Sequence, residues 1–148
     1  MTATTVTVRP ITEDNVRAVL ALDVTEEQSA FVAPNAVSMA EASVTTMVWQ
    51  RAIYAAEELV GYVLLSDDHV QPRFYLWRFM IDQRFQRRGY GRQAMKLLCD
   101  YVRSRPGGTR LFVSYVPGEA GPQVFYEDVG FITTGRIHEG EHEAALDL

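Results

Sequence analysis

The stretch QRRGYGRQAMKLL, residues 86–98, places two glycines among arginines at the start of a pattern typical of a helix. Shortly before it, RFYLWRFMID, residues 73–82, is dense in aromatic and branched side chains and predicts a strand. A strand, a glycine-rich turn and a helix therefore follow one another. The first amide groups of such a helix have no partner within it, and its macrodipole makes that end partly positive.

The turn has the features of an anion site. Gly89 and Gly91 lack a Cβ atom, so a ligand can approach the backbone closely. Five of the fourteen basic residues fall within residues 84–96, where no acidic residue occurs: Arg84, Arg87, Arg88, Arg92 and Lys96. These observations favour phosphate binding. A purely structural turn is the alternative. The segment has neither the GK[ST] of a Walker loop nor the third glycine of a dinucleotide fingerprint.

The regions outside this segment predict a mixed α/β fold. Alternation, caps and turn residues predict strands at residues 5–10, 51–56, 59–66, 73–82, 110–116, 131–138 and 143–148, and helices at 12–22, 38–49, 90–104 and 122–129. The order is β-α-α-β-β-β-α-β-α-β-β. It indicates a mainly antiparallel sheet with helices on both faces.

Length and composition limit the class of protein. We expect one domain spanning residues 1–148. The net charge of −5 argues against a nucleic-acid or membrane partner and weakly favours a cationic small substrate. The single cysteine, Cys99, excludes an internal disulfide. No signal peptide or membrane span is visible, so we expect a cytoplasmic protein.

The segment HEGEH, residues 138–142, matches the HExxH zinc motif literally. That motif needs a helix to bring both imidazoles to one face. Gly140 and the strand-like runs on either side predict a hairpin turn instead. We expect no metal.

Two segments together resemble the GCN5-related N-acetyltransferase (GNAT) family. Residues 86–91 match its Q/R-x-x-G-x-G/A motif, and VFYEDVGF, residues 124–131, is similar to its L/F-Y-E-x-x-G-F segment. The spacing and the element order match over essentially the whole chain. The resemblance implies an enzyme that uses acetyl-CoA and an amine.

The resemblance also assigns residues to the cofactor. The turn would bind the pyrophosphate through backbone amides, and the preceding strand would pair with the pantetheine arm where it splays from residues 111–115. The residues assigned in this way are Phe79, Met80, Ile81, Gln86, Arg87, Arg88, Gly89, Tyr90, Gly91, Arg92, Glu119 and Phe125. Glu119 stands where the family often has an asparagine, which puts that contact in doubt.

Tyr126 maps to the tyrosine that commonly protonates the departing CoA thiolate in this family. A phenol and a thiol have comparable pKa values, so proton transfer between them is feasible. The alternative is a core tyrosine on a short amphipathic helix.

The acceptor side has a narrower resemblance. EQSAFVAPNAVS, residues 27–38, and YLWRFMID, residues 75–82, are similar to segments of bacterial spermine/spermidine N-acetyltransferases. A polyamine needs carboxylates and aromatic faces, and the candidates are Glu26, Glu27, Tyr75 and Trp77. Glu27 is the first candidate for the general base and Asp82 the second. Alternatively, the acids are solvated and Trp77 is part of the core.

Other acceptors fit the same family. They include another small amine, an amino acid, an antibiotic or a protein N-terminus. A non-catalytic acyl-CoA-binding module is the rival from another class, and the presence of Tyr126 argues mildly against it. A homodimer is possible.

Overall fold

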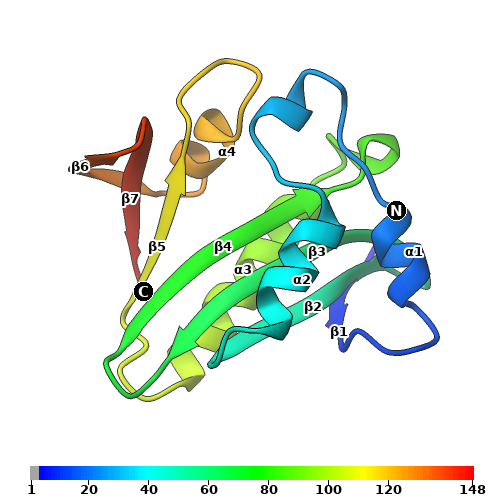
Figure 1. Ribbon diagram of the computed structural model, residues 1–148, viewed down its shortest axis with the longest axis horizontal. Helices are drawn as coiled ribbons and strands as arrows, with labels where there is room; N and C mark the ends of the chain where they lie inside the picture. Colours follow the sequence, from blue (N-terminus) through cyan, green and yellow to red (C-terminus); the bar gives the residue numbers. More distant parts are fainter. Residues whose placement is uncertain (1–3) are drawn as a thin grey trace.

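A computed structural model describes residues 4–148. Within this range seven strands form one sheet in the order β1-β2-β3-β4-β5-β7-β6 (Figure 1). The strands are β1 (Val6–Arg9), β2 (Val48–Ala55), β3 (Glu58–Asp68), β4 (Arg73–Ile81), β5 (Arg110–Tyr115), β6 (Ile132–His138) and β7 (Glu141–Asp147). Neighbouring strands are antiparallel except for β4 and β5, which run parallel. The predicted element order and mixed sheet are confirmed.

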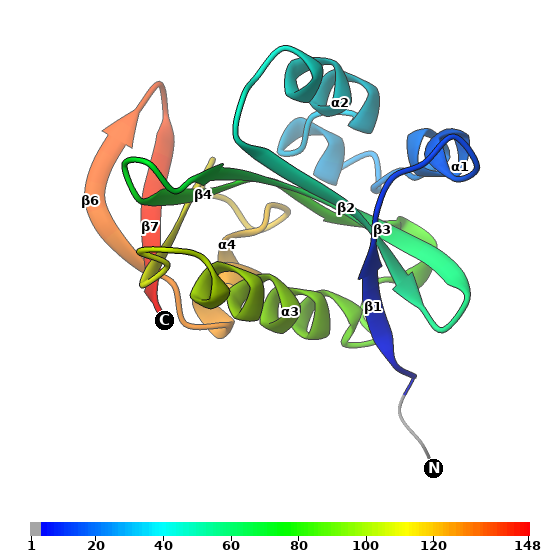
Figure 2. The same cartoon turned by 90° about the horizontal axis from the view of Figure 1, so that it is seen from below.

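Helices cover both faces of the sheet, as predicted. Figure 2 shows α1 (Val16–Ala21) and α2 (Asn35–Ser43) on one face, and α3 (Tyr90–Ser104) and α4 (Gln123–Asp128) on the other. Apolar residues recur every three or four positions along α3, and the buried ones are Ala94, Met95, Leu98, Cys99 and Val102. None of the helices within residues 4–148 has both the length and the apolar character needed to cross a bilayer.

The two halves of the sheet separate between β4 and β5. These strands pair only where residues 74–76 face residues 111–113. Beyond that point β4 continues along β3 as far as Ile81, while β5 continues along β7. Figure 1 shows the two strands diverging. The edge of β4 that faces β5 therefore has no strand partner from Trp77 to Ile81 within the described residues.

The second helix differs from the prediction at both ends. It begins at Asn35, directly after Pro34, and not at a Ser38 cap. Proline fixes its own φ in the helical range and has no backbone N–H that would be left unpaired, so it suits the start of a helix. The helix ends at Ser43, and Trp49 lies in β2, where its ring stacks on Tyr101 of α3 at 4.3 Å. Tertiary packing therefore ends the helix earlier than the local pattern indicates.

The first helix is shorter than predicted. It starts at Val16 because the preceding residues form a hydrogen-bonded turn, in which the Thr12 amide donates to Asn15 Oδ1 at 2.8 Å. At the other end of the chain, the hairpin predicted for HEGEH is confirmed. Glu139 and Gly140 both have positive φ, 51° and 80°, as a two-residue hairpin turn between β6 and β7 requires.

Candidate active site

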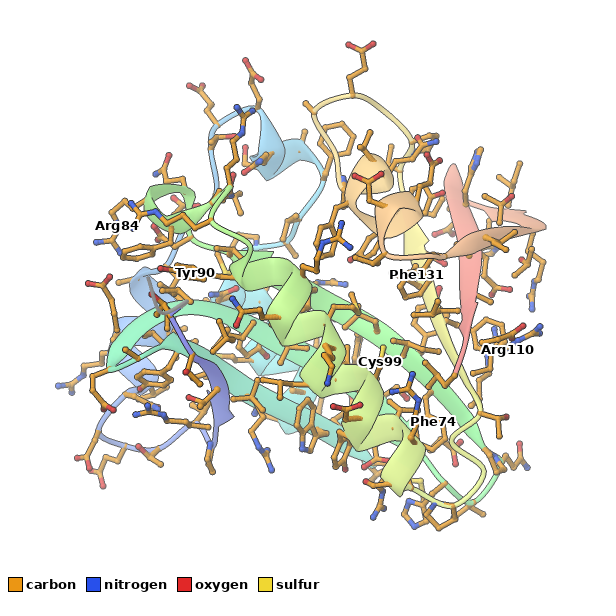
Figure 3. The ribbon with its side chains drawn as sticks, turned by 180° about the vertical axis from the view of Figure 1, so that it is seen from behind. Phe74, Arg84, Tyr90, Cys99, Arg110 and Phe131 are labelled. Atoms are coloured by element: carbon orange, nitrogen blue, oxygen red, sulfur yellow. The ribbon has the colours of Figure 1, made fainter. Side chains whose placement is uncertain are left out.

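A cavity of about 400 Å³ lies where β4 ends, between the glycine turn, α4 and the loop before α2. Most residues predicted to bind the cofactor line it: Phe79, Met80, Ile81, Gln86, Arg87, Gly89, Tyr90, Gly91, Arg92 and Phe125. Figure 3 shows Tyr90 at the start of α3 and Arg84 in the connection from β4. The cavity lining contains no aspartate or glutamate, so its charge comes from Arg87 and Arg92 alone. An anion suits such a cavity.

The glycine turn has the backbone geometry of an anion cradle. Arg87 and Gly89 both have positive φ, 62° and 82°, so successive amides can turn toward one side. Gly89 precedes α3, and no side chain caps the helix or places an acid in its first turn. The amides at this end are therefore available to a ligand. Gly91 packs closely against Phe125: a Cβ atom there would lie 3.3 Å from Phe125 Cε1, so the ring would have to shift by a few tenths of an ångström.

Tyr126 of α4 also lines the cavity and is buried. Its ring stacks on Tyr115 at 5.8 Å and meets Phe131 edge-on at 5.4 Å. The hydroxyl has no hydrogen-bond partner among residues 4–148. Burial raises the pKa of Tyr126 strongly, and the nearby charge of Arg78 offsets part of that rise. The phenol therefore keeps its proton at neutral pH.

A second, polar cavity of about 320 Å³ lies over the strands where β4 and β5 begin to separate. Its lining residues are Arg73, Tyr75, Ser114, Arg136, His138, Glu141 and Glu143. The hydroxyls of Tyr75 and Ser114 share a hydrogen bond across the two strands. Glu143 is buried and accepts a hydrogen bond from Arg73 at 2.9 Å. Glu141 is exposed, and its side chain has no partner within the described residues.

The acceptor residues predicted from sequence are not gathered in one place. Glu26 and Glu27 are exposed in the loop between α1 and α2, and neither lines the first cavity. Tyr75 lines the second cavity. Trp77 is half-buried and packs with the core on the α1 and α2 side of the sheet.

A model of the acetyltransferase (GNAT) family matches residues 13–131. The chain belongs to this family. It is also 24% identical over 138 residues to the spermine/spermidine N(1)-acetyltransferase of Bacillus subtilis (strain 168), with 89% of this chain and 91% of that relative covered.

Solved structures of other GNAT proteins have the same fold. Spermidine N-acetyltransferase from Vibrio cholerae in complex with CoA and spermine superposes with a TM-score of 0.72 at 13% identity, covering 96% of this chain and 95% of that one. Ribosomal-protein-S18-alanine N-acetyltransferase from Escherichia coli gives 0.70 at 15% identity, covering 97% and 94%. At these identities the likeness shows the fold alone.

GNAT enzymes use acetyl-CoA, and the first cavity is the candidate site for that molecule. The turn offers free amides and arginines to the phosphates, and the unpaired edge of β4 offers backbone groups to an amide-containing arm. Two residues assigned to the cofactor lie outside the cavity lining. Arg88 is exposed and donates to the Arg84 carbonyl at 3.2 Å, and Glu119 is exposed in the loop between β5 and α4.

Asp82 holds the start of the glycine turn in place and is poorly suited to act as a base. It is buried, and its carboxylate accepts hydrogen bonds from the Asp23 amide and from the amide and Nε of Arg84, at 2.8–2.9 Å. Burial works against the charged form, but the hydrogen bonds from Arg84 and Asp23 outweigh it and lower the pKa of Asp82. A carboxylate with a lowered pKa and occupied oxygens has little tendency to take a proton.

The sequence patterns did not predict several residues that line the first cavity, among them Gln28, Phe31 and Pro122. Phe31 packs against the loop between β5 and α4, where a Cβ atom on Gly121 would lie 2.6 Å from its ring. The apolar FVA run at residues 31–33, inside an otherwise polar loop, was the available signal.

Proposed function

We propose that this GNAT enzyme transfers the acetyl group of acetyl-CoA directly to a primary amine of a polyamine such as spermine or spermidine. The observation that supports the proposal is that the glycine turn and Tyr126 line one cavity, beside the opening between β4 and β5. The phosphates would lie at residues 87–92 and the pantetheine arm along Phe79, Met80 and Ile81. That arrangement directs the thioester toward Tyr126.

The reaction moves the acetyl carbon from sulfur to nitrogen. A neutral amine attacks the thioester carbonyl, a C–N bond forms, and the C–S bond breaks with its electrons leaving on sulfur. The nitrogen loses a proton and the sulfur gains one. The hydroxyl of Tyr126 donates the proton that the sulfur gains. Burial raises the pKa of Tyr126, so its hydroxyl keeps a proton that it can give to the departing sulfur.

The polyamine assignment is supported by the relative from Bacillus subtilis, whose name includes spermine and spermidine. Because no carboxylate lines the first cavity, we place the cationic chain of the acceptor over Tyr75, toward Glu141 in the second cavity. Glu143 is already paired with Arg73, so Glu141 is the carboxylate free to bind an ammonium group. Glu27, in the loop between α1 and α2, remains a proposed acceptor-binding carboxylate and the first candidate for the general base.

Two matched variants test this arrangement. Glu141→Gln keeps the shape and removes the charge, so we expect KM for spermine to rise about fivefold, the upper end for an exposed ion pair. Glu27→Gln should raise KM less, because Glu27 is also exposed and lines neither cavity. If Glu27 also takes the amine proton, kcat falls and partly recovers at higher pH. Steady-state kinetics across about pH 6–9 separate these roles. Wild-type constants in Glu141→Gln would remove the second cavity from the acceptor site.

An acceptor that carries a carboxylate next to its amine is the second candidate. Arg73 and Arg136 balance Glu141 and Glu143 in the second cavity, so a group bearing both charges would also find partners there. Single amino acids belong to this class. Turnover of these amines in preference to spermine would replace the polyamine with them.

A further inference from the structure

The loop that carries Glu27 is tied to the glycine turn at two points. The first is at its start, where the Asp23 amide donates to Asp82 Oδ2 at 2.9 Å and the Asp23 carbonyl accepts from the Gln83 amide at 2.8 Å. We name residues 23–31 the acceptor loop. The contact fixes one end of this loop to the segment that leads into the anion cradle.

The second point is a reciprocal pair of side-chain amides, Gln28 and Gln86. Gln28 Nε2 donates to Gln86 Oε1 at 3.0 Å, and Gln86 Nε2 donates to Gln28 Oε1 at 2.8 Å. Gln86 Nε2 also donates to the carbonyl of Ile81, the last residue of β4, at 2.9 Å. One side chain therefore connects the strand, the glycine turn and the acceptor loop.

The pair uses all the donor capacity of Gln86. A side-chain amide has two N–H groups, and here one is directed to Ile81 and the other to Gln28. The side-chain amide of Gln86 therefore has no N–H left to donate to a phosphate. Although Gln86 lines the cavity and begins the glycine motif, its side chain acts by holding the turn and the loop together.

The acceptor loop in turn reaches the opposite wall of the cavity. Gln28 and Phe31 both line the cavity, and Phe31 packs against Gly118 and Gly121 in the loop between β5 and α4. A ligand that orders the turn can therefore order the acceptor loop through Gln28 and Gln86. By linkage, ordering of the loop strengthens binding of the same ligand.

We infer that Gln28 and Gln86 are positioning residues that couple acetyl-CoA binding at the glycine turn to the ordering of the acceptor loop. The inference rests on the proposed function, because it requires CoA to bind in the first cavity.

The test is amide hydrogen exchange of the acceptor loop with and without CoA, alongside calorimetry of CoA binding. In the wild type, CoA should slow exchange in residues 24–31 by about fivefold or more, the lower end of typical coupling between sites. Gln28→Ala and Gln86→Ala should each still bind CoA but lose this slowing. The double variant should lose no more of this slowing than either single variant, because the bond between Gln28 and Gln86 is absent in all three.

Ser29→Ala is the matched control. The Ser29 hydroxyl is exposed in the same loop and bonds only within it, to the Glu26 carbonyl at 2.5 Å. This variant should keep the slowing. In steady-state kinetics, Gln28→Ala should raise KM for the amine more than KM for acetyl-CoA, whereas general destabilisation would move both.

These measurements distinguish failure of the coupling from failure of the proposed function. A wild type that binds CoA without slowing of residues 24–31, or glutamine variants that keep the slowing, would overturn the coupling and leave the acetyltransferase proposal intact. A wild type that shows no heat of binding with CoA would refute the proposed cofactor site, and the coupling with it.

Discussion

Replacing Tyr126 with phenylalanine is expected to lower kcat by roughly 10²–10⁴-fold, the usual range for loss of general acid catalysis. The substitution removes one oxygen and keeps the ring that stacks on Tyr115 and Phe131. Because the hydroxyl has no partner within residues 4–148, its loss leaves no protein group unsatisfied. KM for acetyl-CoA and the free energy of unfolding should therefore change little.

Tyr115→Phe is the matched control for this prediction. Tyr115 is equally buried and lies against Tyr126, but it does not line the first cavity. Its loss of a hydroxyl should leave kcat within a few-fold of the wild type.

The pH profile gives a second check on Tyr126. Because burial raises its pKa above the ordinary phenol value near 10, no alkaline loss of activity from Tyr126 is expected between about pH 7 and pH 10. A Tyr126→Phe enzyme with the wild-type rate would mean that water or another residue protonates the sulfur.

Gly89→Asp is expected to weaken acetyl-CoA binding by about 100-fold or more. A carboxylate beside the cradle would oppose the pyrophosphate at short range, where like charges cost about 1–4 kcal/mol at surface dielectric values. The site itself has room, since an added Cβ atom at Gly89 meets nothing within 4 Å. The φ of 82° is left-handed, and aspartate tolerates that region better than most residues.

Gly89→Asn isolates the effect of the charge. Asparagine has the shape of aspartate and a similar tolerance of left-handed φ, but it carries no charge. We expect this variant to lose much less affinity than Gly89→Asp in calorimetric titration with acetyl-CoA. Equal affinities for the wild type and folded Gly89→Asp would exclude residues 87–92 as the pyrophosphate site.

The fold was predictable from sequence where the signals are local. The aromatic β4, the glycine turn and the amphipathic α3 each follow from spacing and composition within a few residues. The ends of helices and strands that were predicted wrongly are those set by contacts between residues far apart in the chain. Trp49 was predicted to end a helix, yet it lies in β2 because its ring stacks on Tyr101.

The candidate site divides in the same way. The residues of the glycine turn are contiguous, so one motif located nearly all of them. The proposed acceptor side uses residues of β4, β5, β6 and β7, and no local pattern indicates that Glu141 lies in the same cavity as Tyr75. The pair of Gln28 and Gln86 joins residues 58 positions apart, which sequence spacing alone does not reveal.

We propose that an amine group of a polyamine takes the acetyl group from acetyl-CoA in the opening between β4 and β5. The most direct test of this proposal is free-thiol release from acetyl-CoA by the wild-type protein, measured with a panel of spermine, spermidine, single amino acids and a peptide with a free N-terminus. We expect amine-dependent release that is fastest with a polyamine and yields one N-acetylated product per thiol. A protein that binds CoA but releases no thiol with any amine would contradict it.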